Sequence, residues 1–179
     1  MNTTVWYEQV DIGLINLINE VFNNRVPIRF RSEDDFVELS YPCILITHLW
    51  ESFDRYRYDD RLVNIGLDEN NNVVMEKSAK PYTLNYQVEL LTTSITDMNE
   101  LTVIWNDTFI DFNNLDVEDV SGNKRNCFMK LKNKTTSSEG SSDENRIFKR
   151  IYTYEIKVEI DTGIKYITPS VQHIDINEK

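Results

Sequence analysis

Two stretches carry residue types that could do chemistry, and neither has the partners that such chemistry needs. Glu33, Asp34 and Asp35 supply adjacent carboxylates, the oxygen ligands that divalent cations prefer. An acidic cluster in a polar turn is nevertheless more often a solvated surface than a metal site. His48 lies in an apolar run and could act as a ligand or general base. No Cys-x-x-Cys or His-x-x-x-His spacing and no nearby serine pairing accompanies it, so a structural histidine is favoured.

Motifs that would identify an enzyme are missing from the sequence. It contains no glycine-rich phosphate loop and no nucleophile elbow, and its five glycines leave little material for either. Carboxylates are abundant, but nothing in their spacing selects an acid–base pair. Cys43 and Cys127 both fall in apolar runs, which is typical of free buried thiols and not of a disulfide framework. We therefore expect no enzymatic activity, no cofactor and no metal.

Residues 55–61 interleave aromatic and basic side chains, a combination that can bind another macromolecule. Such residues stack on nucleic-acid bases, and they also anchor protein interfaces, where arginine and tyrosine are enriched. The chain has 19 basic and 30 acidic residues, a net charge of −11, which opposes binding to DNA or to an anionic membrane. The charge favours a protein interface, formed by Arg55, Tyr56, Arg57, Tyr58 and Arg61.

The overall length and the termini suit a soluble protein. A chain of 179 residues is long enough for one ordinary domain. The N-terminus lacks a basic segment followed by an apolar run, and no stretch approaches the ~18 consecutive apolar residues that a membrane helix requires. We expect a cytosolic protein with no membrane partner.

The strongest pattern in the sequence is a strand that runs into a helix, over residues 82–112. Apolar residues at every second position predict a strand with one face on a core. Apolar residues at steps of three and four then predict a helix, with Asp97 as its N-cap and Glu100 closing a capping box. The two apolar sets are Leu84, Tyr86, Val88 and Leu90, then Met98, Leu101, Trp105 and Phe109.

Shorter patterns place the remaining elements. Apolar spacing predicts a helix over residues 5–24, and a proline-containing segment at 26–30 is typical of an edge strand. An apolar run at 43–50 predicts a buried central strand. Residues 113–126 are polar and are expected to form a surface connection, followed by a strand at 127–131. The clearest alternation, at 148–160, predicts a long strand.

Together these elements predict an α+β fold. We expect a mixed, mainly antiparallel sheet with an N-terminal helix, a second helix packed on one face, and long hairpin or loop excursions. Residues 1–161 would form a single domain, with an excursion at 55–80. A loop at 133–145, which has no apolar residue to offset the entropy of ordering, is expected to be mobile.

The C-terminal residues 162–179 are expected to form an extended arm. They carry several apolar side chains among polar ones, whereas a disordered tail would usually be less apolar. We predict that this arm finds a surface on its own chain or on a neighbour, and that Tyr166 and Ile167 contribute to a subunit interface.

Three pairs of segments, in this order along the chain, carry a family resemblance: Pro42-Cys-Ile-Leu-Ile46 with Phe53-Asp-Arg-Tyr-Arg57, Pro81-Tyr-Thr-Leu-Asn-Tyr-Gln-Val-Glu-Leu90 with Asp97-Met-Asn-Glu-Leu101, and Arg146-Ile-Phe-Lys-Arg-Ile-Tyr-Thr-Tyr-Glu-Ile-Lys-Val158. They resemble small neck proteins of tailed phages, and more narrowly the tail terminator, or tail-to-head joining, family. The likeness is one of element order over residues 5–160, without a short invariant motif.

This resemblance implies a structural virion protein and not an enzyme. Proteins of this family form hexameric rings that end the growth of a tail tube or sheath and supply the surface on which the filled head docks. The implied partners are further copies of the chain, the tube or sheath protein and the head–tail connector, and DNA passes through the ring without specific binding. The implied location is the neck of the virion, after assembly in the host cytoplasm.

Two alternatives remain open at this point. A head–tail connector (stopper) or a baseplate component could have the same architecture. A monomeric cytosolic binding domain would instead contain a preformed apolar pocket with converging polar groups.

Overall fold

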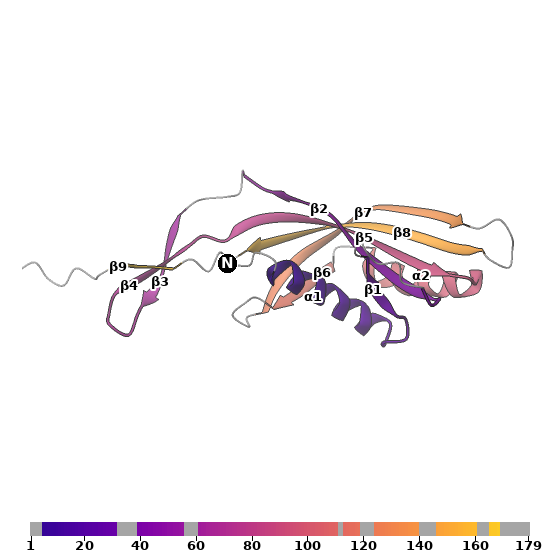
Figure 1. Ribbon diagram of the computed structural model, residues 1–179, viewed down its shortest axis with the longest axis horizontal. Coiled ribbons are helices and arrows are strands. Elements are labelled where there is room, and N and C mark those ends of the chain that lie inside the picture. The colour runs from indigo at the N-terminus through magenta and orange to yellow at the C-terminus, as the bar shows by residue number, and fades with distance from the viewer. Residues whose placement is uncertain are drawn as a thin grey trace, which may run out of the picture. The chain divides into compact units, whose positions relative to one another are not determined.

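The computed structural model describes residues 5–31, 39–55, 61–110, 113–118, 124–139, 146–160 and 165–168 (Figure 1). The chain divides into two compact units. The larger unit comprises Met1–Ser52 and Thr83–Val158, and the smaller comprises Phe53–Tyr82 and Glu159–Lys179. None of the helices within the described ranges is long and apolar enough to cross a membrane.

The larger unit contains the two helices, α1 (Val5–Val21) and α2 (Ile95–Phe109), and a six-stranded sheet. The sheet has the order β1-β2-β5-β8-β7-β6 and is mixed, because β1 pairs with β2 in parallel whereas β7 pairs antiparallel with β6 and β8. The chain is therefore a strand-rich α+β protein, as the sequence predicted. The strands are β1 (Ile28–Phe30), β2 (Cys43–Phe53), β5 (Lys80–Thr92), β6 (Asn113–Glu118), β7 (Lys124–Glu139) and β8 (Ile147–Ile160).

Trp105 on α2 is the centre of the core. Its ring centroid lies 4.3 Å from that of Phe109, 5.4 Å from Tyr152 and 6.1 Å from Phe22, which follows α1. Both helices therefore contribute to one core beneath the sheet, and Figure 1 shows them on the same side of it. The apolar sets predicted for β5 and α2 are all buried, which confirms the periodicity of both segments.

The start of α2 differs from the prediction. The N-cap is Ser94, three residues before the expected Asp97, and its side chain accepts a hydrogen bond from the Asp97 N–H at 3.3 Å. Asp97 thus occupies the third helical position, where its charge favours the positive end of the helix dipole. Serine and aspartate are both preferred at the N-cap, so residue type alone did not distinguish the two positions.

Three other predictions for the larger unit need correction. The expected surface connection at 113–126 contains the edge strand β6, whose Leu115 and Val117 are buried. The loop expected at 133–145 is strand up to Glu139, because β7 pairs with β8 as far as Glu139 and Ile147, and residues 140–145 lie outside the described range. Main-chain pairing to a long neighbour thus ordered a segment that has no apolar side chains. β2 is buried only over its first four residues.

The smaller unit is a three-stranded antiparallel sheet in the order β3-β4-β9. Its strands are β3 (Leu62–Leu67), β4 (Val73–Lys77) and β9 (Lys165–Thr168). β3 and β4 form a hairpin within the predicted excursion, and residues 165–168 of the predicted arm pair with β4 of their own chain. Residues 169–179 lie outside the described range.

The hairpin turn between β3 and β4 is closed by one carboxylate, that of Asp68. Asp68 accepts hydrogen bonds from the N–H groups of Asn70 and Asn72, both at 2.8 Å, and from the Asn72 amide at 3.0 Å. These donors lower the pKa of Asp68 below its usual value, the Asn72 side chain contributing most. Asn71 takes the left-handed conformation with φ of 61°, which asparagine tolerates.

Candidate functional site

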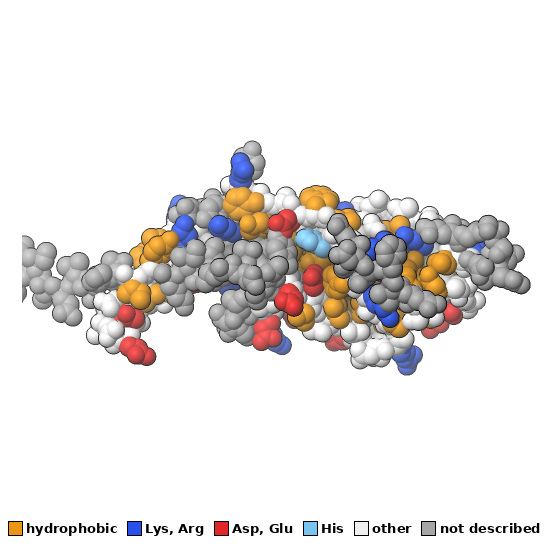
Figure 2. Space-filling model, viewed as in Figure 1, with side chains coloured by type: hydrophobic (Ala, Val, Ile, Leu, Met, Phe, Trp, Pro, Cys, Tyr) orange, Lys and Arg blue, Asp and Glu red, His pale blue; other side chains and the backbone are white. Residues whose placement is uncertain are grey.

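The most unusual surface of the protein is the small sheet. Every residue of β3 is exposed, although four of its six side chains are large and apolar. The exposed fraction is 46% for Leu62, 49% for Val63, 46% for Ile65 and 62% for Leu67. On β9, at the other edge, Ile167 is 64% exposed. Figure 2 shows hydrophobic side chains at the surface of this unit.

The strand register places these side chains on both faces of the small sheet. Leu67 lies beside Val73, and Met75 lies beside Tyr166, all on one face. Val74 lies beside Ile167 on the opposite face. We call the first surface the Leu67 face, which is formed by Leu62, Leu67, Val73, Met75 and Tyr166.

A sheet of this kind buries too little apolar area by itself. Three strands need a hydrophobic face packed against another layer to be stable, and the described part of the smaller unit contains no helix. The β3 strand also contains no charged residue from Leu62 to Leu67. The Leu67 face is therefore a candidate protein-interaction surface.

The residues predicted for a subunit interface fall partly on this unit. Arg61 immediately precedes β3, and its carbonyl accepts a hydrogen bond from the Ser78 N–H at 2.9 Å. Tyr166 and Ile167 lie on β9, at the other edge of the same sheet. Arg55 is exposed in a turn of the same unit. Tyr56, Arg57 and Tyr58 lie outside the described residues, so the centre of the predicted stretch stays a prediction.

Sequence reasoning missed β3 itself. Residues 62–67 were expected only as part of the excursion at 55–80, with no strand assigned to them. The available signal was an uncharged six-residue run rich in branched apolar side chains, which is typical of a strand. The pairing of β9 with β4, on the far side of β4 from β3, could not be inferred from that run.

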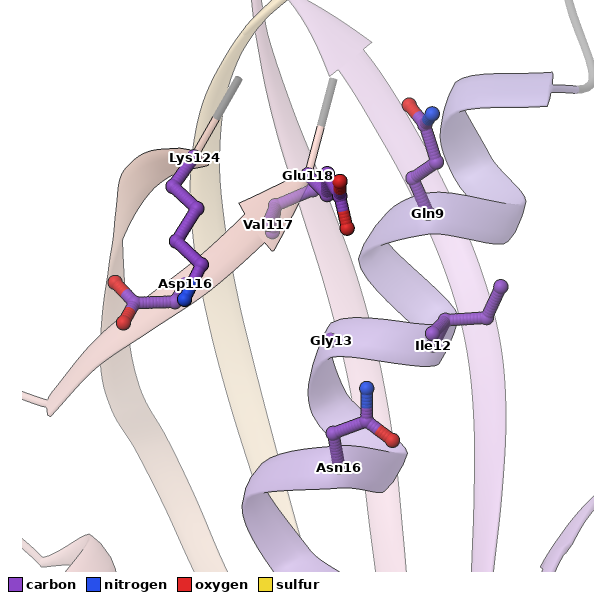
Figure 3. Close-up of a pocket in the computed structure, with 8 residues that line it drawn as sticks. All are labelled: Gln9, Ile12, Gly13, Asn16, Asp116, Val117, Glu118 and Lys124. Carbon is purple, nitrogen blue, oxygen red and sulfur yellow. The ribbon is translucent and has the colours of Figure 1, made fainter. Parts of the chain in front are cut away.

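A polar pocket of about 510 Å³ lies between α1 and the β6–β7 edge of the larger unit (Figure 3). At its floor Gly13 packs so closely on β6 that a Cβ there would lie 2.8 Å from the Asp116 carbonyl oxygen. The lining combines amides, two carboxylates and one lysine, without a histidine or cysteine. The pocket is lined by Gln9, Ile12, Gly13, Asn16, Asp116, Val117, Glu118 and Lys124.

A second cluster of titratable groups joins α1 to the sheet. The Tyr86 hydroxyl donates a hydrogen bond to Asp11 at 2.7 Å, and the His48 ring packs 5.0 Å from the Tyr86 ring. Burial raises the pKa of Asp11, opposed by the Tyr86 hydrogen bond, and partial burial lowers the pKa of His48. A neutral imidazole beside a tyrosine held by a carboxylate is a packing arrangement, and none of the three lines the pocket described above.

A buried ion pair lies on β5, three residues after Tyr86. Glu89 is 1% exposed, and its carboxylate lies 2.8 Å from Lys149 Nζ on β8 and 3.7 Å from Arg31. The Gln87 amide also donates to this carboxylate. Two cations and one amide surround this buried acid, and the ion pair between Glu89 and Lys149 links β5 to β8.

Metal and thiol chemistry receive no geometric support from the described residues. Within these ranges no three His, Cys, Asp or Glu side chains come together as a metal site. Glu33, Asp34 and Asp35 lie outside the described residues. Cys43 and Cys127 are both free and buried, which confirms the prediction for the two thiols.

No protein-family model matches the chain, and no curated protein matches it.

Proposed function

We propose that this chain is a structural subunit of a tailed-phage neck, a ring-forming tail terminator that ends tail growth and docks the head at the head–tail junction. The observation that carries the proposal is the small sheet with apolar side chains exposed on both faces. The order of elements in the sequence, which resembles that family, points the same way. The protein would be assembled in the host cytoplasm and located in the neck of the virion.

Exposed apolar area of this size favours a subunit of an assembly. Six apolar side chains of the three-stranded sheet are half-exposed, but they are divided between its two faces. A partner on one face would therefore bury only some of them, as part of the ~800 Å² that each partner buries in a standard interface. Soluble monomers rarely leave such a surface uncovered. In a ring of about six copies, a neighbouring subunit or the tail tube would cover the Leu67 face.

The charge of the chain suits a ring through which DNA passes. Each copy carries a net charge of −11, so a ring of six would be strongly acidic. Lysine or arginine contacts to phosphate add salt-dependent affinity, which would retard a passing duplex. An acidic lumen repels DNA and therefore supports passage without specific binding.

A connector or a baseplate component would use the same apolar surface, so these remain the nearest alternatives. The pocket between α1 and β6 is the observation that favours the other alternative, a monomeric ligand-binding domain. Only two of its lining side chains, Ile12 and Val117, are large and apolar, which weakens that candidate.

The first test is the mass and shape of the purified protein. Light scattering should give a particle near six times the 21.1 kDa chain, and negative-stain images should show a ring with a central hole. Purified tail tubes mixed with the protein should acquire capped ends. Capped tubes distinguish a terminator from a connector, and a protein that neither forms rings nor caps tubes contradicts the proposal.

The second test addresses the surface. Leu62→Lys with Leu67→Lys should abolish rings and tube capping, because two lysines on the Leu67 face must be desolvated in any contact. The matched control is Val103→Lys with Ile110→Lys, since these side chains are 59% and 43% exposed on or beside α2 in the larger unit. Rings that persist in the first variant would place the interface elsewhere.

A further inference from the structure

We propose that copies of this chain join head to tail through the small sheet, the Leu67 face of one copy packing on the opposite face of the next. We call that opposite face the Val74 face, which is formed by Val63, Gly66, Val74 and Ile167. This contact deepens the proposed function and rests on its premise that the chain assembles with itself. A ring alone does not specify which two surfaces of the subunit meet, and this contact does.

The strand register determines the Val74 face. Gly66 lies beside Val74, and Val74 lies beside Ile167 on its other side. Val63 lies beside Glu76, two residues further along β4 and therefore on the same face. Val63 and Ile167 are 49% and 64% exposed. The small sheet thus exposes apolar side chains on both faces, and the described part of the smaller unit contains no second layer to cover either face.

Two exposed apolar faces on one sheet limit the kinds of contact that can cover them. A twofold contact joins like surfaces, so it covers one face and leaves the other in water. A head-to-tail contact covers the Leu67 face of one copy and the Val74 face of the next, and its repetition covers both faces of every copy inside the assembly. A different protein would need two separate surfaces to do the same, whereas a second copy already carries both.

The two faces are complementary in the size of their side chains. The Leu67 face carries long side chains, among them Leu62, Met75 and Tyr166. The Val74 face carries mostly shorter ones, and a Cβ added at Gly66 would meet no atom within 4 Å, so the surface is open there. Facing layers pack densely when large side chains of one meet small side chains of the other. Packing either face on itself would instead set long side chains against long ones, or short against short.

Charge does not oppose this contact. Within the paired strands, the Leu67 face carries one charged residue, Lys77, and on the Val74 face Glu76 lies beside Lys165 in the register. Neither face therefore has an excess of acidic residues, although the whole chain has a net charge of −11. Lys77 also interacts within its own chain, and the contact does not require that lysine to change partners. Two copies can thus meet at these faces without the repulsion that their overall charge would produce.

Two variants that each disable one face test the contact. Leu62→Lys with Leu67→Lys disables the Leu67 face, and Val63→Lys with Ile167→Lys disables the Val74 face, because a lysine must be desolvated in any contact. Neither variant alone should associate, since every contact needs one face of each kind. An equimolar mixture should form a dimer of twice the 21.1 kDa chain and nothing larger, because only one intact pair of faces is present. The wild-type chain should form larger particles, and light scattering measures all four samples.

The matched control is Val103→Lys with Ile110→Lys, exposed positions on or beside α2, which should assemble as the wild type does. Circular dichroism checks that the variants are folded. Leu67→Ser and Ile167→Ser, which introduce no charge, repeat the test if a lysine variant does not fold. A variant that dimerises by itself would show that like faces pair, and would overturn the proposal. A mixture of folded variants that stays at 21.1 kDa, or a wild-type chain that does not associate, would overturn it too.

The contact and the proposed function fail by different results. If the wild type forms rings and caps tail tubes but the mixture gives no dimer, the contact is wrong and the function stands. If the mixture gives the dimer but the wild type forms open filaments and caps no tubes, the contact stands and the function is wrong. Both outcomes are possible because a head-to-tail contact makes a ring where its rotation closes and a filament where it does not.

Discussion

At the scale of single residues, hydrogen bonds in the core link Trp105 on α2 to Tyr154 on β8. The Trp105 indole N–H donates to the Tyr154 hydroxyl at 2.8 Å, and this hydroxyl donates to the Phe109 carbonyl at 3.2 Å. One tyrosine on β8 therefore satisfies an indole donor and a carbonyl at the end of α2, in a core where all three residues are buried.

Tyr154→Phe should lower the free energy of unfolding by about 1–3 kcal/mol, because it leaves two buried polar groups without partners. Chemical denaturation followed by tryptophan fluorescence measures this change. Tyr166→Phe is the control, since that hydroxyl belongs to an exposed residue and its loss should be nearly neutral. Equal effects in the two variants would contradict the assigned role of Tyr154.

Asp11 gives a prediction for pH dependence. Burial raises its pKa in the folded state, so its contribution to stability is complete below the unfolded pKa and is lost as the pH rises through the folded value. Asp11→Asn keeps an acceptor for the Tyr86 hydroxyl and removes the buried charge. The variant should therefore gain stability over the wild type at neutral pH, with the gain disappearing near pH ~3.5, below the usual aspartate pKa.

Asp68→Asn provides a control of opposite sign for that experiment. Its donors lower the pKa of Asp68, so this carboxylate contributes stability above the unfolded pKa and loses it as the pH falls. Asp68→Asn should lose stability at neutral pH and converge with the wild type in acid. Thermal unfolding at several pH values would measure the stability of both variants. If both variants gained, or both lost, stability at neutral pH, the assigned pKa directions of Asp11 and Asp68 would be refuted.

At the scale of the elements, α1 packs closely on β6 because Gly13 has no side chain. A Cβ at position 13 would lie 2.8 Å from a main-chain oxygen of Asp116 and 3.3 Å from Val117, so β6 or the helix would have to move. Alanine is about 1 kcal/mol more favourable than glycine within a helix, which opposes this cost.

Gly13→Ala should nevertheless destabilise the protein, by about 1–3 kcal/mol net, since overpacking against backbone is not relieved by a rotamer change. Asn16→Ala, one turn later on the exposed side of the same helix, should be neutral or stabilising. Urea denaturation of both variants makes the comparison. A stabilised Gly13→Ala would show that the approach of α1 to β6 is looser than described.

The N-terminus of α2 gives a second prediction at this scale. Ser94→Ala removes the side chain that accepts from the Asp97 N–H and should cost about 1 kcal/mol, whereas Thr93→Ala, at the exposed preceding position, should cost little. Thermal unfolding compares the two variants. A larger effect at Thr93 would indicate a different cap.

At the scale of the whole molecule, the two compact units should differ in stability. The six-stranded sheet buries both apolar and aromatic side chains against two helices, whereas the small sheet leaves its apolar side chains exposed. Local opening free energy follows buried contact area, so the units should open separately.

Hydrogen exchange measures this difference. Amides of β5 and β8 should exchange slowest. Those of β3, β4 and β9 should exchange faster in the monomer and become protected when the protein assembles. The central strands serve as the internal reference. Equal protection of both sheets in the dispersed chain would mean that the small sheet is already covered.

The sequence by itself determined the helices, most strands and the face that each buries. Periodicity is a local property, so Leu84 to Leu90, Met98 to Phe109 and Tyr152 to Val158 revealed their buried faces without any knowledge of neighbours. The prediction of two buried thiols was equally local, since it rests on the apolar run around each cysteine.

Only the tertiary structure decided which strands are neighbours. β6 and the second half of β7 have little apolar pattern of their own, and pairing with longer strands orders them. β9 joins a hairpin almost 100 residues earlier in the chain, which makes an exposed apolar sheet from segments that are separately unremarkable. Main-chain hydrogen bonding carries almost no sequence signature, so the edges of a sheet, and the surfaces that they offer to other chains, become visible only in three dimensions.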